Sequence, residues 1–482
     1  MVRLPSRLGP VSTVVIALCL VYGAGSTFAQ TETTSSPGEP IPGTGGVSPF
    51  AGSVPEKPVA GVLPVSLKDA IDRGLRQNLG ALLSNADIRS ARGQRWQQLS
   101  ALLPHATVSP FVDVSQINLT EFGFTQFPGV AVPSAVGPFS YFDARVNVSQ
   151  TLFNWKSINN VRASGQSLKS AEYTYKDARD LVVLAVGYTY LQGIADEARI
   201  KTAEAQVNVA QALYDQAADQ VKAGTSAQID ALRAKVELQT RQQQLIQAKN
   251  SLAIQKLTIA RVIGLAPGQE FELTDKSPYQ PFEGMTLEGA LQHAYESRSD
   301  YQAAVADTRA AGYARKAATA GYLPSLSFDA DYGAAGAHPS NATQVFDVKG
   351  TLTIPIFLGN SVHGDVLQAD ARLTQARERQ ENLRAQIDAD VRTAFFNLQS
   401  SAEQVAVARS NIDLADQTLA QSRDRFTAGV ADSVEVVQSQ ELVASANEQY
   451  ISSLYSFNFA KISLARALGM GEEGVKTFFK EK

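Results

Sequence analysis

Two carboxylates occupy matching positions in the sequence, each six residues after a glycine. Asp230 follows Gly224, Glu435 follows Gly429, and the two acids are 205 residues apart. One interpretation is structural, because acids in a first helical turn stabilise the positive end of the helix dipole, and Asp432 and Glu435 have the spacing of a capping box. The other is functional, because carboxylates gathered around a narrow opening concentrate cations. The residues alone leave both interpretations open.

Side chains that could support catalysis or bind a metal form no recognisable pattern. The histidines have neither HxxxH nor HExxH spacing, and they are His105, His293, His338 and His363. The sequence contains no phosphate-binding glycine loop and no GxSxG elbow. The formal net charge of −4 gives no electrostatic reason to bind nucleic acid. We therefore expect no enzyme activity, no cofactor, no metal and no nucleic-acid partner.

The first 29 residues have the composition of an export signal. Arg3 and Arg7 precede an apolar stretch, 11–22, that is too short to span a bilayer, and small residues suitable for cleavage end at Ala29. Cys19, the only cysteine, would leave with the signal. Lipidation of Cys19 is the alternative, although Leu18 stands where a small residue is needed. Residues 30–62 are rich in Pro, Gly, Ser and Thr, which predicts a flexible segment.

The remainder of the sequence is a tandem repeat, with a first unit at 63–275 and a second at 286–470. Residues 67–70 match residues 287–290 at an offset of 220, and the motif at 223–225 matches that at 428–430 at an offset of 205. The offset changes because the first unit has a longer loop, 119–140. Two units are too few for an ordinary solenoid, so the duplication suggests pseudo-symmetry. We expect a short C-terminal tail at 471–482.

Each unit predicts one shorter helical stretch, two strands, and then two long helices rich in Ala, Gln, Leu and Arg. The expected helices span 66–103 with a break near 78–80, 154–222, 226–263, 287–321, 359–427 and 432–468. A helix of about 69 residues is about 100 Å long, which suits a coiled coil or a long tube. The two shorter helices of each unit nearly match the longest one if they stack end to end.

Four segments alternate apolar and polar residues with the period of two that is typical of amphipathic strands. They span 106–117, 142–152, 326–332 and 346–356. A sheet that covers a soluble core shows the same alternation. The export signal and the long polar helices favour membrane strands instead, with Val146 facing lipid and Asn147 facing a lumen. Because membrane strands must close into a barrel and single-chain barrels need about 8 strands, the chain must oligomerise.

Duplicated helix–hairpin–helix–helix units, an export signal and four membrane strands resemble the TolC-like outer-membrane channel family over residues 62–470. The most specific local features are the turns after the long helices, at 220–225 and 425–430. The resemblance implies a mainly α-helical homotrimer in the outer membrane, with a shared 12-stranded β-barrel continued by a periplasmic helical tube. It implies the export of drugs or proteins, driven by an inner-membrane pump joined through a periplasmic adaptor.

The resemblance also implies where the functional residues lie. Asp230 and Glu435 match positions at the periplasmic constriction, where three chains would place six carboxylates. Phe426 stands where a gating tyrosine often sits, and Gln438 replaces a second acid of the ring. Ala431 replaces an arginine that often holds the closed state, so we expect apolar packing to close this mouth. The turn tips point toward the adaptor, and their expected contact residues are Ala223, Gly224, Thr225, Ala428, Gly429 and Val430.

The sequence therefore predicts a passive exit duct of a tripartite efflux pump or a type I secretion system. The alternative is a secreted or periplasmic coiled-coil structural protein without a pore. A periplasmic enzyme is a further class, and the absence of a catalytic pattern disfavours it.

Overall fold

The computed structural model describes residues 49–121, 123, 133–275, 281, 285–431 and 433–478. The chain divides into two units, Met1–Val47 and Ser48–Lys482, and all the described residues belong to the second. The expected export signal with Cys19, the first part of the flexible segment and the last four residues of the tail lie outside the described residues.

The first repeat begins with a helix broken in two, as the sequence predicted. Ser66 caps α2, with which it forms a capping box through Asp69, and Asn78 ends α2 and caps α3 with its side chain. After the strands, two long helices run to the end of the repeat. The helices are α2 (Leu67–Gln77), α3 (Leu79–Ser100), α4 (Trp155–Lys222) and α5 (Gln228–Ile263).

The second repeat reproduces this order with one break that we did not predict. The segment expected as a single helix over 287–321 is α6 and α7, interrupted at Arg298. Arg298 lies 220 residues after Asn78, which is the repeat offset found in the sequence. The helices are α6 (Leu287–Ser297), α7 (Ser299–Thr319), α8 (Ser361–Thr427) and α9 (Ser433–Ala467).

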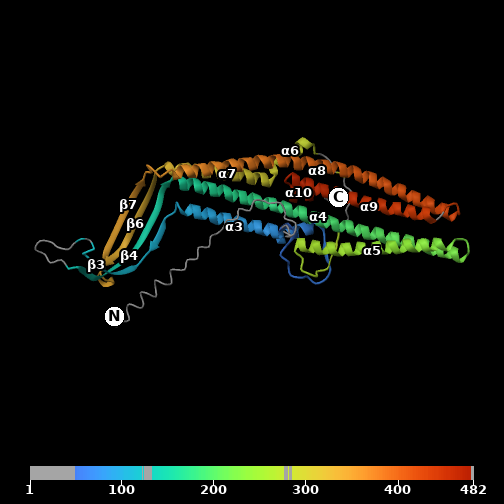
Figure 1. The fold of residues 1–482 in the computed structure, drawn as a ribbon, viewed down its shortest axis with the longest axis horizontal. Helices are drawn as coiled ribbons and strands as arrows, with labels where there is room; N and C mark the ends of the chain where they lie inside the picture. The colour runs from blue at the N-terminus through green and yellow to red at the C-terminus, as the bar shows by residue number, and fades with distance from the viewer. Residues whose placement is uncertain are drawn as a thin grey trace, which may run out of the picture. The chain divides into compact units, whose positions relative to one another are not determined.

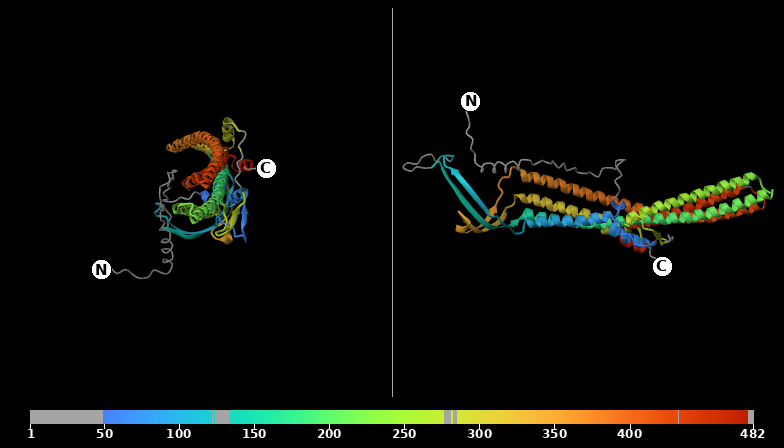
Figure 2. Two further views of the ribbon diagram at one scale, coloured as in Figure 1. Left: turned by 90° about the vertical axis from the view of Figure 1, so that its right-hand side faces the viewer. Right: turned by 90° about the horizontal axis from the view of Figure 1, so that it is seen from below.

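The helices lie side by side in one layer (Figure 1). Near the strands, α3 packs against α4, α4 against α7, and α7 against α8; toward the turns, α5 packs against α4, α4 against α9, and α9 against α8. The shorter helices of each repeat therefore follow one another along the long one, as expected. Seen from the turn end, the layer is curved (Figure 2, left). Among the described residues, we find no helix that is both long enough and apolar enough to cross a membrane.

A five-stranded antiparallel sheet lies at the opposite end from the two turns (Figure 1). Its strands are β2 (His105–Val108), β3 (Phe111–Asn118), β4 (Ala135–Asn154), β6 (Ser325–Gly336) and β7 (Thr343–Thr353). They are ordered β2-β4-β6-β7, and β3 pairs with β4 beyond β2. The two edges of the sheet are therefore β2 with β3 on one side and β7 on the other.

The cross-strand register confirms that the two faces of this sheet differ. One row joins Val108, Val146, Tyr332 and Phe346, and the next row, on the other face, joins Thr107, Asn147, Asp331 and Asp347. Residues directly opposite each other in a sheet share a face, so the alternation read along single strands extends across β2, β4, β6 and β7. On the polar face, Arg145 pairs with Asp143 at 2.6 Å and with Asp331 at 3.3 Å.

Several strand boundaries differ from our expectations for identifiable reasons. The strand expected at 106–117 is interrupted before Phe111, because Pro110 has no N–H to donate to the ladder. Likewise β7 ends at Thr353, before Pro355, and not at 356. β4 begins at Ala135, within the segment expected as a loop. A register shift after Thr151 places Phe153 opposite Leu326.

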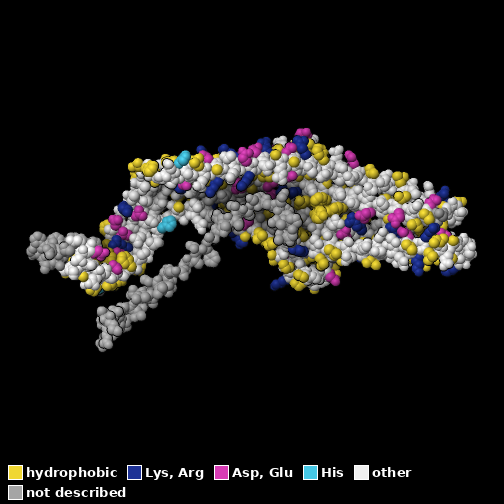
Figure 3. Space-filling view, in the orientation of Figure 1, with side chains coloured by type: hydrophobic (Ala, Val, Ile, Leu, Met, Phe, Trp, Pro, Cys, Tyr) yellow, Lys and Arg dark blue, Asp and Glu magenta, His cyan; other side chains and the backbone are white. Residues whose placement is uncertain are grey.

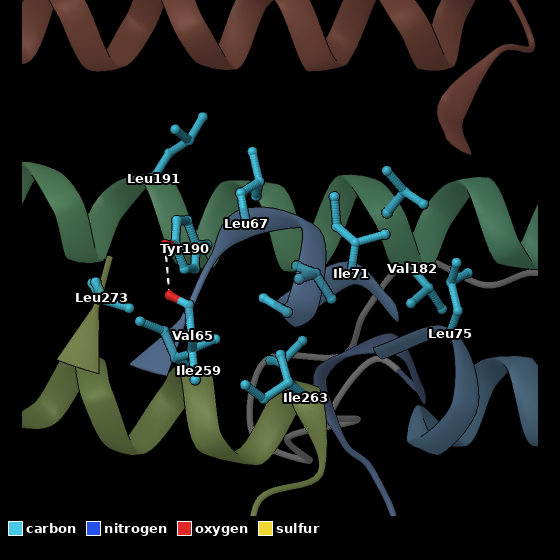
Figure 4. Packing of buried hydrophobic residues seen from close by; sticks show 14 of the residues in the cluster. Val65, Leu67, Ile71, Leu75, Val182, Tyr190, Leu191, Ile259, Ile263 and Leu273 are labelled. Atoms are coloured by element: carbon cyan, nitrogen blue, oxygen red, sulfur yellow. Dashed lines mark hydrogen bonds between the residues drawn. The ribbon is translucent and has the colours of Figure 1, made fainter. Parts of the chain in front are cut away.

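Two hydrophobic clusters hold the layer together midway along the long helices. In the first, α2, α4 and α5 pack with the short parallel strands β1 (Leu63–Val65) and β5 (Phe271–Leu273). The buried Tyr190 hydroxyl donates to the Val65 carbonyl at 2.9 Å (Figure 4). In the second cluster, Phe457 of α9 packs with residues of α6 and α8. Each repeat thus builds most of its core from three corresponding helices, α2, α4 and α5 in the first and α6, α8 and α9 in the second.

The segments that flank the repeats have more structure than we expected. Residues 49–62, assigned to the flexible segment, pack along the α2–α3 break, where Val54 N–H donates to Gln77 O at 2.9 Å and Asn78 donates to Phe50 O at 2.7 Å. Within the expected C-terminal tail, Gly471–Phe478 form α10. Helix α10 packs against α9 and α4.

Candidate functional site at the helix turns

The α4–α5 turn has the geometry of a Schellman motif. The N–H of Thr225 donates to Gln220 O at 2.9 Å and the N–H of Gly224 donates to Val221 O at 3.0 Å, which satisfies carbonyls at the end of α4. Gly224 has φ of +71°, a conformation that glycine adopts without steric cost. The glycine is therefore required by the backbone of the turn.

The α8–α9 turn repeats this geometry bond for bond. The N–H of Val430 donates to Arg425 O at 3.0 Å, the N–H of Gly429 donates to Phe426 O at 3.0 Å, and Gly429 has φ of +73°. All six residues expected at the two tips are exposed: Ala223, Gly224, Thr225, Ala428, Gly429 and Val430. The duplicated sequence thus forms two similar exposed tips at the same end of the layer (Figure 1).

Asp230 lies in the first turn of α5 and its side chain is mostly covered. The Ser226 hydroxyl donates to its carboxylate at 2.9 Å, and Arg233 lies 3.8 Å away, one turn further along the same helix. Ala227, the N-cap residue of α5, makes no side-chain cap hydrogen bond. Asp230 thus contributes an acid to the helix N-terminus without closing a capping box.

Glu435 lies in the first turn of α9 and pairs across the turn. Its carboxylate is 3.0 Å from Nε of Arg425, which belongs to the last turn of α8. Asp432, the other member of the expected capping box, lies outside the described residues. Just behind this pair, the buried hydroxyls of Ser422 and Ser439 are 2.7 Å apart, which links α8 to α9.

The other residues expected at the mouth differ from one another in exposure. Phe426 is half-buried at the end of α8, whereas Gln438 is exposed on α9 and Ala431 is half-buried in the turn. Sequence reasoning missed both arginines that pair with the acids. The repeat offset of 205 could have drawn attention to them, because each arginine is present in one repeat and replaced by glutamine in the other. Arg233 aligns with Gln438, and Arg425 aligns with Gln220.

Surface charge around the tips is mixed, and both signs are visible there (Figure 3). Beside the first tip, a hydrogen bond to Asp219 raises the pKa of Lys222. In the described part of the chain, no three His, Cys, Asp or Glu side chains gather as a metal ion would require. The tips therefore combine exposed apolar residues, Val430 among them, with charged residues of both signs.

Two ion pairs further from the tips join one helix hairpin to the other. Arg199 of α4 is 2.9 Å from Glu448 of α9, and Arg241 of α5 is 2.8 Å from Glu441 of α9. Arg241 is buried and also pairs with Glu237 at 2.6 Å. These contacts connect the hairpins through α9, in addition to the packing of α4 against α9.

The family model described as outer membrane efflux protein matches residues 76–265 and 290–470, which include both long hairpins and both turns. This chain belongs to the outer membrane efflux protein family. The two matched segments correspond to the two repeats seen in the fold.

Individual relatives of this outer membrane efflux protein are distant. A pyoverdine export outer membrane protein of Pseudomonas putida is 23% identical over 68% of this chain and 71% of the relative. The outer membrane protein TolC of Escherichia coli is 20% identical over 68% and 69%. The alkaline protease secretion protein AprF of Pseudomonas aeruginosa is 21% identical over 70% and 71%.

Solved structures share the fold over most of the chain. The CmeC outer membrane channel of Campylobacter jejuni superposes with a TM-score of 0.73 over 86% of this chain and 88% of its own, at 17% identity. The outer membrane protein VceC of Vibrio cholerae gives a TM-score of 0.72 over 84% and 96%, at 18% identity. The expected mainly helical, TolC-like fold and the outer-membrane location are confirmed.

Proposed function

We propose that this protein is the outer-membrane exit duct of a tripartite efflux pump or a type I secretion system, and that it conducts cargo passively. The family match across both repeats carries the proposal. The relatives' names include pyoverdine export and alkaline protease secretion, so both kinds of cargo occur among similar proteins. The two-faced sheet disfavours a plain coiled-coil rod, because such a rod has no use for a sheet with an apolar face at its end.

We infer that three copies form the duct, and the two unequal edges of the layer support this. One edge consists of β2, β3, α3 and α5, and the other consists of β7 and α8. Edges that differ can join only head to tail, and head-to-tail contacts close into a ring when the rotation permits. Closing the sheet also removes strand edges, which cannot face lipid.

Exposed apolar residues follow both edges at the spacing of a helix seam. On α5 they include Ile229, Leu232, Val236, Ile246 and Leu257, and on α8 they include Phe396, Val407 and Leu414. Intervals of 3, 4, 7, 10 and 11 residues keep side chains on one helix face. Because apolar stripes of this kind mark protein contacts, α8 of one copy is expected to pack on α5 of the next.

We assign the acids and the turns their roles on the same basis. Threefold assembly would bring the copies of Asp230 and Glu435 toward one opening, where they would favour cations. Half-buried Phe426 would supply apolar closure beside them, with exposed Gln438 on the rim. The exposed tips, Thr225 and Val430 among them, would meet a periplasmic adaptor that connects the duct to an inner-membrane pump.

A matched pair of substitutions in β4 tests the membrane assignment. Val146→Asp places a carboxylate in the apolar row that also contains Tyr332, whereas Asn147→Asp places one in the polar row that already contains Asp331. A charge on the lipid face costs up to about 2–4 kcal/mol near the midplane, and less for acids. Native mass spectrometry of detergent extracts should show trimer for the wild type and Asn147→Asp, and a strong loss for Val146→Asp. Equal yields from the two variants would contradict the assignment of the faces.

A further inference from the structure

The C-terminal helix α10 sits on the first repeat through contacts that only glycine allows. After α9, the chain turns at Gly469, where an added Cβ would lie 2.8 Å from the Cα of Arg298. At Gly471, the first residue of α10, an added Cβ would lie 2.6 Å from a carboxylate oxygen of Asp180. The end of the second repeat is therefore pressed against the α6–α7 break and against α4.

Asp180 receives the N-terminus of α10. The residue is 9% exposed on α4, and its carboxylate accepts a backbone hydrogen bond from Glu472 in the first turn of α10. The neighbouring Arg179 is 2.6 Å from the Glu472 carboxylate. The Arg179–Glu472 ion pair fixes the orientation of α10 on α4.

Behind Asp180, further charges connect the repeats. Arg466 of α9 pairs with Asp177 of α4 and lies 4.0 Å from Asp300 of α7. Arg298, at the α6–α7 break, pairs with Asp300 at 2.6 Å and with Asp390 of α8 at 3.0 Å. Most of these side chains are largely covered, so loss of one partner would leave a buried charge without compensation and would destabilise the contact between the repeats. Helix α10 closes one side of this network.

We propose that α10 is a reversible clasp, seated on Asp180, which holds the end of the second repeat against the long helix of the first and grips more tightly in mildly acidic surroundings. The clasp is a property of a single subunit, so it stands whether or not the assembled chain conducts. Its parts are the Asp180 carboxylate, the glycine at the start of α10 and the Arg179–Glu472 pair.

The direction of the pH effect follows from the groups that face Asp180. Burial raises the pKa of Asp180 to about 6. Arg466 and the backbone hydrogen bond from Glu472 act to lower it, Asp177 and the Glu472 carboxylate act to raise it, and burial prevails. Burial also raises the pKa of Asp177. Asp300 behaves differently from Asp180 and Asp177. Burial acts to raise the pKa of Asp300, but the hydrogen bond and charge of Arg298 outweigh burial and lower it, so Asp300 binds no proton in this pH range.

Release of α10 would expose Asp180 to water and return its pKa toward its ordinary value of 3.8. A group with a raised pKa in the docked state binds a proton on docking, so docking strengthens as the pH falls through 6 toward 4. Between pH 7.5 and pH 5 the docking equilibrium should shift about tenfold, since each pH unit below the raised pKa contributes a factor of about ten.

Hydrogen–deuterium exchange of the full-length protein in detergent measures this equilibrium. Protection factors for the α10 amides, corrected for the intrinsic pH dependence of exchange, should be about tenfold higher at pH 5 than at pH 7.5. Asp180→Asn keeps a hydrogen-bond acceptor but cannot titrate, so its protection should be the same at both values. Gly471→Ala should lose protection at both values, because its methyl group meets Asp180.

Asp219→Asn, which removes an exposed carboxylate of α4 far along the helix from α10, is the matched control and should behave as the wild type. The clasp is refuted if wild-type α10 is unprotected throughout or equally protected at both pH values. It is also refuted if Asp180→Asn keeps the wild-type pH dependence. Should Gly471→Ala fail to fold, the comparison of Asp180→Asn with Asp219→Asn decides the question.

Discussion

The two helix turns have the same backbone and different charges. Gly224 and Gly429 have φ values of +71° and +73°, and the hydrogen bonds that end α4 recur at the end of α8. The acids that follow are paired differently. Asp230 interacts within its own segment, with Ser226 and Arg233, whereas Glu435 reaches back across the turn to Arg425.

This difference teaches that the turn and its ion pairs are separable. The backbone geometry depends on the glycine and on the carbonyls of the preceding helix, which both repeats share. The pairing depends on which repeat carries an arginine at each of two aligned positions. Both pairs are partly exposed, and such pairs contribute at most about 1 kcal/mol. Any strong effect of the two acids on the duct should therefore come from the attraction of their charges for cations at the opening, and not from these ion pairs.

The largest expected effect comes from removing both acids. Asp230→Ala with Glu435→Ala should lower the cation selectivity of the duct in planar bilayers and weaken block by trivalent cations added from the periplasmic side. The reason is that like carboxylates crowded at a ring attract multivalent cations most strongly. The trimer should persist, because each acid lies in the first turn of a helix and its ion pair contributes at most about 1 kcal/mol.

If the double variant keeps full selectivity and block, the acids serve the helix N-termini only. Asp388→Asn, at a half-buried position of α8 far from the turn, is a suitable control and should change neither property.

The next prediction asks whether the shared backbone gives the two tips the same partner. Because Cys19 is the only native cysteine and the expected export signal would carry it away, Thr225→Cys and Val430→Cys can each be crosslinked selectively to an adaptor in cells. We expect both to react, since both tips are exposed and have the same geometry. A cysteine at exposed Leu367, on α8 near the sheet, is the control and should not react. Crosslinking confined to lateral helix positions would refute docking at the tips.

A smaller effect is expected where the repeats differ in packing. Phe426 of the second turn aligns with Val221 of the first, and Phe426→Ala removes a half-buried aromatic ring. Loss of about 1 kcal/mol of packing should raise the resting conductance roughly fivefold. Val221→Ala removes fewer atoms and should have a weaker effect. An unchanged resting conductance in Phe426→Ala would exclude apolar packing at this position as the closing force.

The smallest effect should follow loss of the cross-turn ion pair. Arg425→Gln removes an ion-pair partner of Glu435, and its effect on resting conductance should stay below fivefold and vanish at high salt, because exposed pairs are weak and screened. Arg233→Gln, which makes the first turn resemble the second at that position, should change the conductance even less. A large, salt-independent effect of Arg425→Gln would show that the pair is a true lock.

Most of the fold was predictable because the repeat is explicit in the sequence. The turns, the long helices and the break at Asn78 follow from glycines, helix formers and capping residues. The break at Arg298 was missed because no glycine or asparagine marks it, although the offset of 220 from Asn78 pointed to it. The division of the expected first strand into β2 and β3 follows from Pro110, which has no N–H to donate to β4.

The site was predictable only as positions along the chain. Exposure of the tips followed from the turn motif, but the partners of Asp230 and Glu435 depend on side-chain directions across a turn. The pairing of Arg425 with Glu435 joins two helices at a distance that no spacing rule specifies. The seat of α10 on Asp180 is less accessible still, since it joins residues almost 300 positions apart.

The conductance of the purified protein in planar bilayers tests the central claim most directly. If the protein is a duct, a preparation that native mass spectrometry identifies as trimeric should give discrete single-channel currents, carried by cations in preference to anions. A trimer that never conducts, or a monomeric or rod-like protein without channels, would contradict the account.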